Sequence, residues 1–510
     1  MKYPKRPISL NPRRSAQNHT STREKTLVSL LLGLMVTAST AFAQEYYWSP
    51  GGTVSDYQTG GSGIWSTSDA NWSSDGTTFS SWSSSTGNNA YFQGTSGTYD
   101  IDVSGNFSTG ALVFETDGYS LSASSATTMN LGGGIRVNDG VTVTLENNLT
   151  MLRNYQGFSI SGSDTGTGTL VVNETSSLTT TGNGGSGKGN YYLTQGIEVI
   201  VDGGSMTAGN GSSGIRLGDT SGTASANETN TLTIKNNGTV TLVGTGGLQA
   251  RGVNKNTSKS VLNLDGGTLA TTKIGRSNTQ FSLNFNGGTL QALAESTNFI
   301  YDGDSAGNTT AYVKEGGAIF DTNGFDVTVT QDMIHGGVAA IDGGLIKRGA
   351  GTLTLDDSNS YTGLTTVEAG TLLLSENGSI TSDVTVLSGG IFGGSGTVTG
   401  DITFAEGSSY AFSLNDTLTT SGSIYFEGFG ITDLAGLDSA TMNGMYNLIS
   451  GTVNTANLAN IGLENAQDLG GGKKAYFEIN SLDVVVIPEP STWALVMISL
   501  LAIIPLRRRK

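Results

Sequence analysis

The sequence contains no cysteine, only 7 prolines and 2 histidines, and charged residues make up 13% of its 510 positions. Without cysteine, disulfide cross-links and thiol chemistry are excluded. So small a share of charge argues against ordinary intrinsic disorder. Glycine, by contrast, occurs 75 times, which suits stacked strands joined by tight turns. The composition therefore favours one long repetitive fold over several globular domains.

The scarcity of histidine limits the chemistry that the chain could perform. His335, in the context DMIHGGV, is the single histidine after residue 43. Hydrolysis that depends on a histidine base has at most this one candidate, and a zinc site of the usual His/Cys type is not available. No glycine-rich stretch has the lysine and the strand-to-helix setting of a P-loop, so nucleotide binding has no support.

Basic residues are few outside the two ends of the chain. Between residues 44 and 486 there are 15 basic and 40 acidic residues, a net charge of −25. So negative a surface disfavours nucleic acid and anionic lipid as partners. It is compatible with divalent cations or with a hydrated extracellular setting.

One stretch, GGLIKRGAGTLTLDDSNSYTGLTTVEAGTLLL from Gly343 to Leu374, shows the pattern that organises the chain. Apolar and small polar residues alternate over Gly351 to Leu355, Thr365 to Val367 and Thr371 to Leu374, and turn-forming residues separate these runs. A period of two is typical of half-buried strands. So small a unit cannot bury its apolar face alone, and it needs copies stacked on either side.

Degenerate copies of this pattern recur along the chain, each with a glycine pair or its near equivalent. Their second glycines are 20 to 34 residues apart, at Gly204, Gly238, Gly267, Gly288, Gly317, Gly344, Gly370 and Gly390. Such intervals are typical of solenoid repeats. We therefore predict an all-β fold, a right-handed parallel β-helix over residues 111–414, with strands at Val141 to Leu145 and Leu170 to Val172 and a mobile loop at residues 182–190.

The segment Gly343 to Leu374, taken whole, resembles the autotransporter-associated β-strand repeat, also called the passenger-associated transport repeat. The resemblance covers about 32 residues. It implies a β-helical passenger that is exported from the cell.

The first 43 residues have the features of a secretory signal peptide. A basic leader precedes the apolar run Leu27 to Val36, and Ala41-Phe42-Ala43 gives the small-x-small pattern before Gln44. We predict general secretion with cleavage between Ala43 and Gln44. The alternative is a short amino-terminal membrane anchor, although the apolar run is short for a spanning helix.

Residues 44–110 are rich in tryptophan. Trp48, Trp65, Trp72 and Trp82 lie here, and GIWSTSDANWSSDG resembles the module that commonly opens such repeats. These rings could stack on sugars, or they could form an amino-terminal cap that covers the open end of the solenoid. We favour the cap.

Residues 415–486 depart from the repeat pattern. We predict a carboxy-terminal cap module there, with a short helical piece at Thr455 to Ile461 and two late strands at Ala475 to Ile479 and Leu482 to Val486.

Residues 487–510 resemble the PEP-CTERM sorting domain. Pro488-Glu489-Pro490 precedes the apolar run Trp493 to Leu506, and the chain ends in Arg507-Arg508-Arg509-Lys510. The resemblance implies that an exosortase-type enzyme recognises Pro488, Glu489 and Pro490 and processes the tail. The apolar run predicts a single transmembrane helix with its basic end in the cytoplasm. The alternative is a permanent tail anchor.

Carbohydrate cleavage is the enzymatic alternative, because β-helices also host pectin lyases and polygalacturonase-type hydrolases. Candidate carboxylates are Asp356 with Asp357, Asp302 with Asp304, and Asp321 with Asp326. In glycine-rich turns such pairs are more often solvated corners or loose Ca²⁺ sites. We predict no catalytic residue and no cofactor beyond a possible Ca²⁺.

The sequence thus predicts an exported adhesin or scaffold at the cell surface or in the extracellular matrix. Its partners would be the secretion machinery, the exosortase and an extracellular polysaccharide or cell-surface ligand, with no nucleic acid.

Overall fold

The computed structural model describes residues 43–489 except 155, 164–165, 183–188, 210, 213, 219–226, 255, 303–308 and 480–481. The predicted signal peptide, most of the predicted loop at 182–190, Asp304, Pro490 and the apolar run from Trp493 lie outside these residues. Within them the chain forms β-strands, short turns, one α-helix, α1 (Val54–Thr59), and two 3₁₀ turns, η1 (Ile431–Asp433) and η2 (Leu463–Asn465).

The strands build three sheets, here named A, B and C. Sheet A consists of β1 (Gln44–Trp48), β3 (Trp72–Ser73), β4 (Asn88–Phe92), β7 (Leu112–Phe114), β10 (Ile135–Val137), β13 (Phe158–Ser161), β16 (Tyr191–Thr194), β19 (Gly214–Leu217), β22 (Gly247–Arg251), β25 (Ile274–Ser277), β28 (Ser296–Asp302), β31 (Val327–Val329), β34 (Thr352–Leu355), β37 (Gly370–Leu374), β40 (Gly390–Gly394), β43 (Ser409–Ala411) and β45 (Leu434–Ala435). Sheet B consists of β2 (Gly63–Trp65), β5 (Tyr99–Val103), β8 (Tyr119–Ser122), β11 (Thr142–Leu145), β14 (Gly168–Asn173), β17 (Ile197–Asp202), β20 (Thr229–Lys235), β23 (Lys259–Asp265), β26 (Gln280–Phe285), β29 (Thr309–Val313) and β32 (Met333–His335).

Sheet C begins with β6 (Phe107–Thr109), β9 (Thr127–Leu131), β12 (Leu149–Asn154), β15 (Ser177–Thr181), β18 (Ser205–Ala208), β21 (Thr239–Leu242), β24 (Thr268–Thr271), β27 (Thr289–Ala292), β30 (Ala318–Asp321) and β33 (Leu345–Arg348). It continues with β35 (Ser358–Asn359), β36 (Thr365–Val367), β38 (Ser379–Ile380), β39 (Val384–Val386), β41 (Thr397–Val398), β42 (Ile402–Phe404), β44 (Leu418–Phe426), β46 (Gly444–Val453), β47 (Gln467–Gly470), β48 (Lys473–Ile479) and β49 (Leu482–Pro488).

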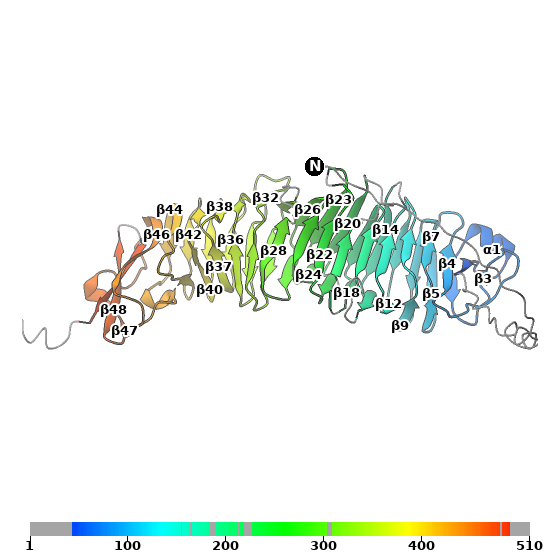
Figure 1. The fold of residues 1–510 in the computed structure, drawn as a ribbon, viewed down its shortest axis with the longest axis horizontal. Coiled ribbons are helices and arrows are strands. Elements are labelled where there is room, and N and C mark those ends of the chain that lie inside the picture. Colours follow the sequence, from blue (N-terminus) through cyan, green and yellow to red (C-terminus); the bar gives the residue numbers. More distant parts are fainter. Residues whose placement is uncertain are drawn as a thin grey trace, which may run out of the picture. The chain divides into compact units, whose positions relative to one another are not determined.

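From β4 to β31, each strand pairs in parallel with the strand three places along the chain. In one coil, β22 pairs with β19 and β25, β23 with β20 and β26, and β24 with β21 and β27. Up to β32, each coil therefore adds one strand to each sheet. Sheet B ends at β32, and later coils add one strand to sheet A and two to sheet C, such as β35 with β36 and β38 with β39. The strands follow one another in chain order through the stack (Figure 1). This arrangement is a parallel β-solenoid.

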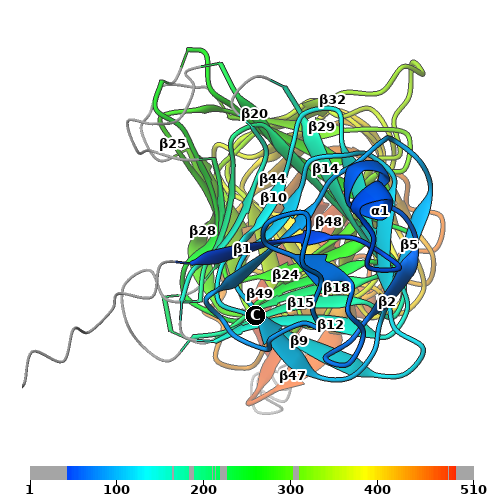
Figure 2. The ribbon, with the colours of Figure 1, turned by 90° about the vertical axis from the view of Figure 1, so that its right-hand side faces the viewer.

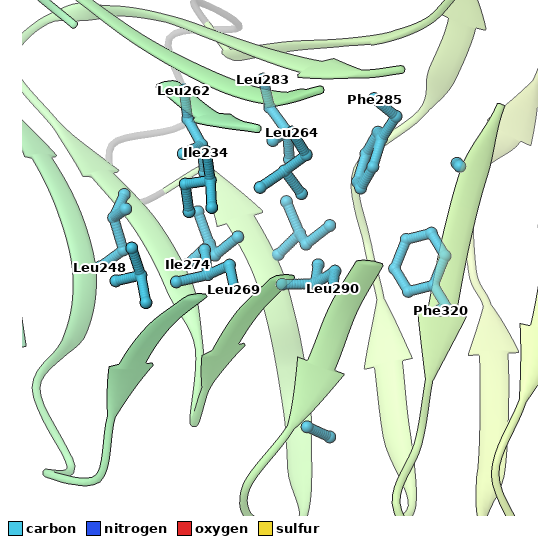
Figure 3. Close-up of a cluster of buried hydrophobic side chains, with 14 of the residues drawn as sticks. Ile234, Leu248, Leu262, Leu264, Leu269, Ile274, Leu283, Phe285, Leu290 and Phe320 are labelled. Carbon is cyan, nitrogen blue, oxygen red and sulfur yellow. The ribbon is translucent and has the colours of Figure 1, made fainter. Parts of the chain in front are cut away.

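The core lies between the three sheets, which surround it when the stack is viewed from its end (Figure 2). In Figure 3, Leu262 and Leu283 of sheet B face Leu269 and Leu290 of sheet C. Each is fully buried and in register with its neighbour on the next coil. Because burying one such side chain contributes about 1.5 to 3 kcal/mol, continuous columns of aliphatic residues are enough to hold a chain that has no cross-links.

The two glycines of a coil corner have different roles. Gly266 has a φ of +87°, and a Cβ there would meet no atom within 4 Å. Gly267 has no positive φ, but its Cβ would lie 2.5 Å from Ile234 Cγ2 and 2.8 Å from the carbonyl oxygen of Gly238. The first glycine turns the chain, and the second lets neighbouring coils approach each other.

The repeat segment Gly343 to Leu374 spans a little more than one coil. Its three alternating runs become β34, β36 and β37, with β36 at the predicted limits. A two-residue strand, β35, lies between them and was not predicted. From this segment on the coils are short, since Leu353 pairs with Leu372 only 19 positions later, whereas Met206 pairs with Val240 after 34.

Antiparallel strands occur at both ends of the described chain. At the first end, β3 pairs antiparallel to β1. At the other, β46, β49, β48 and β47 form an antiparallel ribbon that continues sheet C. The two predicted late strands lie within β48 and β49. The helical piece predicted at Thr455 to Ile461 is wrong, because residues 455–461 form turns and isolated bridges.

Candidate functional site

His335 lies at the end of β32, beside the corner that leads into the repeat segment. Its Nδ1 is 2.9 Å from Asp342 Oδ2 and 3.3 Å from Thr362 Oγ1. Both partners therefore contact the same ring nitrogen. A histidine base needs one nitrogen for its orienting carboxylate and the other for the nucleophile, so this arrangement is not that of a catalytic triad.

Asp342 is the centre of this cluster, and its role is to join two coils. Its carboxylate accepts hydrogen bonds from the backbone N–H groups of Gly344, Thr362 and Gly363 at 2.8 to 2.9 Å. Burial opposes ionisation, but these donors and the His335 ring outweigh it and hold the pKa of Asp342 below its usual range. The charged Asp342 carboxylate therefore stabilises the turn by accepting hydrogen bonds from its backbone N–H groups.

The proposed carboxylate pairs are also engaged in turns. Asp321 accepts hydrogen bonds from Gln291 Nε2 and the Asn323 N–H, and Asp326 accepts one from the Thr352 N–H. Each carboxylate therefore stabilises a local turn or a neighbouring coil.

The two carboxylates of Asp356 and Asp357 have different roles: one contacts the next coil and the other stabilises a local turn. Asp356 accepts from the hydroxyl of Ser375, one coil later, whereas Asp357 accepts from the Ser358 N–H. Among the described residues, no group of three or more carboxylates and histidines is placed to hold a metal ion.

Lys347 occupies an unexpected place in the repeat segment. Its side chain is fully buried, in the sheet C column between Phe320 and Val367. The Nζ donates to the carbonyl oxygens of Arg348, Gly349 and Ala369 at 2.9, 2.8 and 3.0 Å. All three ammonium protons thus have acceptors, and the lysine ties two consecutive corners together.

The four tryptophans predicted to cap the solenoid or to stack on sugars are all buried, with exposed fractions between 0% and 2%. Trp65 is at the centre of the group, with ring centroids 4.8 Å from Trp72 and 5.2 Å from Trp82. Because the rings pack on one another and on Phe92, they are not available to a sugar. Sugar stacking by these tryptophans was therefore a wrong hypothesis.

The predicted signal cleavage site and the predicted sorting motif lie at the two ends of the described residues. Ala43 is exposed, and Gln44 begins β1, where its N–H donates to the Gly87 carbonyl at 3.1 Å. Pro488 ends β49 opposite Lys473, and the Glu489 N–H donates to the Gly472 carbonyl at 2.6 Å. Pro488 and Glu489 are exposed. Within residues 43–489, no described helix has the length and apolarity needed to cross a membrane.

Two hollows on the outer side of sheet A were not predicted from the sequence. One, of about 680 Å³, is lined by residues that include Lys273, Asn298 and Tyr301. The other, of about 210 Å³, is lined by residues that include Arg216 and Arg251. Their residues come from different coils, so no local pattern in the sequence marks them.

The fold places the chain in the class of parallel β-solenoids, and two comparisons with known proteins narrow that class. Residues 345–374 match the family model of the Passenger-associated-transport-repeat. The chain is also similar to the Adhesin BmaC autotransporter of Brucella suis biovar 1 (strain 1330), with 33% identity over 153 residues. That alignment covers 28% of this chain and 4% of the relative, so the chain spans a small part of that protein. No solved structure matches.

Proposed function

We propose that the protein is an exported adhesin or scaffold, displayed at the cell surface or in the extracellular matrix. The observation that carries this proposal is the passenger-associated repeat at residues 345–374, which coincides with β33 to β37 of a continuous solenoid. The partial likeness to an autotransporter adhesin supports the same function. The solenoid would be right-handed, the hand that parallel crossover connections favour.

Export and sorting would begin with removal of residues 1–43 and end at the carboxy-terminal tail. Pro488-Glu489-Pro490 would be recognised by an exosortase-type enzyme after the apolar helix from Trp493 to Leu506 has entered the inner membrane. The exposure of Pro488 and Glu489 supports access for such an enzyme. The net charge of −25 over residues 44–486 supports an extracellular partner other than nucleic acid.

The experiment measures the intact mass and the cell fraction of the protein in its native host, with and without Pro488, Glu489 and Pro490 changed to alanine. We expect the wild type to lose the residues beyond the motif and to leave the inner membrane, and the triple variant to stay there uncut. Glu376→Ala, in an exposed turn between β37 and β38, is the matched control and should be processed normally. An uncut tail in all three proteins would contradict sorting and would indicate a permanent anchor.

A further inference from the structure

Five residues on the outer face of sheet A form an in-register row across five coils. Tyr192, Arg216, Gln249, Gly275 and Tyr301 are consecutive Cα partners on β16, β19, β22, β25 and β28. Neighbouring strands lie about 4.8 Å apart, so the row places its side chains at regular intervals along the solenoid axis. This spacing is of the same order as the length of one sugar ring.

Gly275 determines how the last ring of this row lies. A Cβ at position 275 would come 2.5 Å from Tyr301 Cζ and 2.6 Å from Tyr301 Cε1. The phenol ring therefore lies across β25, in space that any other residue would fill. Tyr301 is half-buried and lines the larger hollow, so it provides a flat aromatic surface at that hollow.

Arg216 of this row and Arg251, two positions after Gln249 on β22, both carry positive charge. Arg216 Cζ lies 5.2 Å from the centre of the Tyr192 ring, and Arg251 Nε donates to Gln249 Oε1 at 3.0 Å. Burial and then the nearby Arg216 guanidinium lower the pKa of Arg251. Across the described part of the chain, neither guanidinium forms an ion pair with a carboxylate.

Lys273 adds a third cation in the lining of the larger hollow, where Glu295 is the acidic residue. This balance is opposite in sign to that of the whole chain. A negatively charged ligand would relieve the mutual repulsion of Arg216 and Arg251.

The wall of the larger hollow is a bulge in β28. Ser296 pairs with Val327 and Ile300 with Val329, so four steps along β28 match two along β31. The extra residues and the preceding turn form one side of the hollow, and Thr245 belongs to the linings of both hollows. Bulges of this kind are common beside functional sites because they redirect side chains.

We propose that this groove, formed by the two hollows and the row between them, binds an extended acidic polysaccharide through its carboxylates and sugar rings. The carboxylates pair with Arg216 and Arg251, a sugar ring stacks on Tyr301, and Gln249, Thr272 and Asn298 hydrogen-bond to hydroxyl groups. The inference rests on the proposed function, because it names the ligand that an extracellular scaffold would hold. Binding of a single-stranded polynucleotide relies on aromatic rings on which successive bases stack, whereas Tyr301 is the one aromatic residue in the linings of the two hollows, which is why we choose a polysaccharide over a polynucleotide.

The test is titration calorimetry of the full-length protein with polygalacturonate, with its fully methyl-esterified form and with dextran. We expect binding of polygalacturonate that weakens with salt, and at least tenfold weaker binding of the two uncharged polymers. Arg251→Gln should weaken the binding of polygalacturonate about tenfold, because it removes a charge-assisted hydrogen bond.

Gly275→Ala is the most specific test of the Tyr301 ring, because it removes no group that contacts the ligand. The new methyl group displaces the Tyr301 ring, whose far end can move without a change in the backbone. We expect a melting temperature close to that of the wild type and several-fold weaker binding. Arg136→Gln, an exposed arginine on β10 of the same sheet, is the control for net charge and should bind within about twofold of the wild type.

Three results would overturn the proposal: no binding of polygalacturonate at low salt, equal binding of the three polymers, or equal effects of Arg136→Gln and Arg251→Gln. None of these results bears on where the protein is sorted, which the intact mass and cell fraction report separately. Surface display without polysaccharide binding would therefore contradict this inference alone.

Discussion

Lys347 shows how a single residue can hold two coils of a solenoid. Its position in the column between Phe320 and Val367 is one that other coils fill with aliphatic or aromatic side chains. The ammonium group is tolerated because three backbone carbonyls surround it and the carboxylates of Asp321 and Asp326 lie near enough to favour the charge. An inward lysine thus provides hydrogen bonds that the corner would otherwise lack.

Replacing Lys347 by methionine should keep the packing and remove the donors. Because three carbonyl oxygens lose their partner, we expect the free energy of unfolding to fall by about 1 to 3 kcal/mol. Thermal or denaturant unfolding followed by circular dichroism measures this. Arg348→Met is the adjacent control, since it removes an exposed ion pair with Glu368 of the kind that contributes at most about 1 kcal/mol. Equal effects of the two changes would contradict the role of Lys347.

The same lysine makes stability depend on pH in the alkaline range. Burial lowers the pKa of Lys347 to about 8, below its ordinary value of 10.5. The unfolded chain then binds more protons than the folded chain between these values, so stability rises with pH from about 8 to about 10.5. We expect the difference in unfolding free energy between the wild type and Lys347→Met to grow over this range. A flat or falling difference would mean that the three carbonyls keep the ammonium charged.

Asp342 makes the stability of the protein depend on pH in the acid range. Its folded pKa is lowered, so its contribution to stability is present above the ordinary pKa of an aspartate and is lost as the pH falls through the folded value. Asp342→Asn should therefore destabilise the protein by about 1 to 3 kcal/mol at pH 7. The gap between variant and wild type should narrow in acid, as unfolding curves between pH 2 and pH 7 would show. A gap that stays constant with pH would contradict the role of the charge.

At the scale of the element, the coil corner needs two different glycines. Gly267→Val would force a side chain against Ile234 and the Gly238 carbonyl, and we expect a loss of about 1 to 3 kcal/mol. Gly266→Asn is the matched control. The chain already has Asn237, with a φ of +63°, at the same corner of the previous coil. Asparagine tolerates this conformation, so the control should lose less than about 0.5 kcal/mol by thermal unfolding. Equal losses would contradict the division of roles within the corner.

The strands of the repeat segment could be predicted because alternation and turn residues are local signals. The parallel stacking followed from the intervals between glycine pairs. The register could not be predicted, since the length of a coil varies, from 19 positions between Leu353 and Leu372 to 34 between Met206 and Val240. The helix expected at Thr455 to Ile461 was wrong because Leu458 and Ile461 mimic a helical period. They bridge instead to Phe429 and Phe477, and Asn457 and Asn460 have positive φ angles.

The candidate site was predicted less well than the fold. The carboxylate pairs and His335 could be found as residue types, but their use in turns depends on partners in other coils. Tyr192, Arg216, Gln249, Gly275 and Tyr301 are 24 to 33 positions apart, so only the register brings them into a row. No local pattern indicates which residues of successive coils become neighbours.

For the molecule as a whole, we expect residues 44–87 to cap the first end of the stack, because β1 pairs with the edge of β4 and Trp65 packs on Phe92 of that strand. Deleting residues 44–87 removes β1, α1, β2 and β3 and leaves the edge of β4 and the end of the core exposed. An uncovered strand edge pairs with other chains, so we expect the shortened protein to aggregate at micromolar concentrations. Light scattering measures this, with Trp82→Phe, which keeps the covering strands, as the control. A monodisperse shortened protein would contradict the role of these residues as a cap.

The antiparallel strands at both ends also limit how copies of the molecule can assemble. A parallel solenoid with open ends could grow into an endless fibre, because each terminal coil would be a template for the next chain. Here β3 at one end and the ribbon of β46 to β49 at the other break the parallel pattern. Copies can therefore assemble only side by side, as a layer or a mesh. The dimension of such an assembly along the solenoid axis is set by the length of one chain and does not grow with the number of molecules.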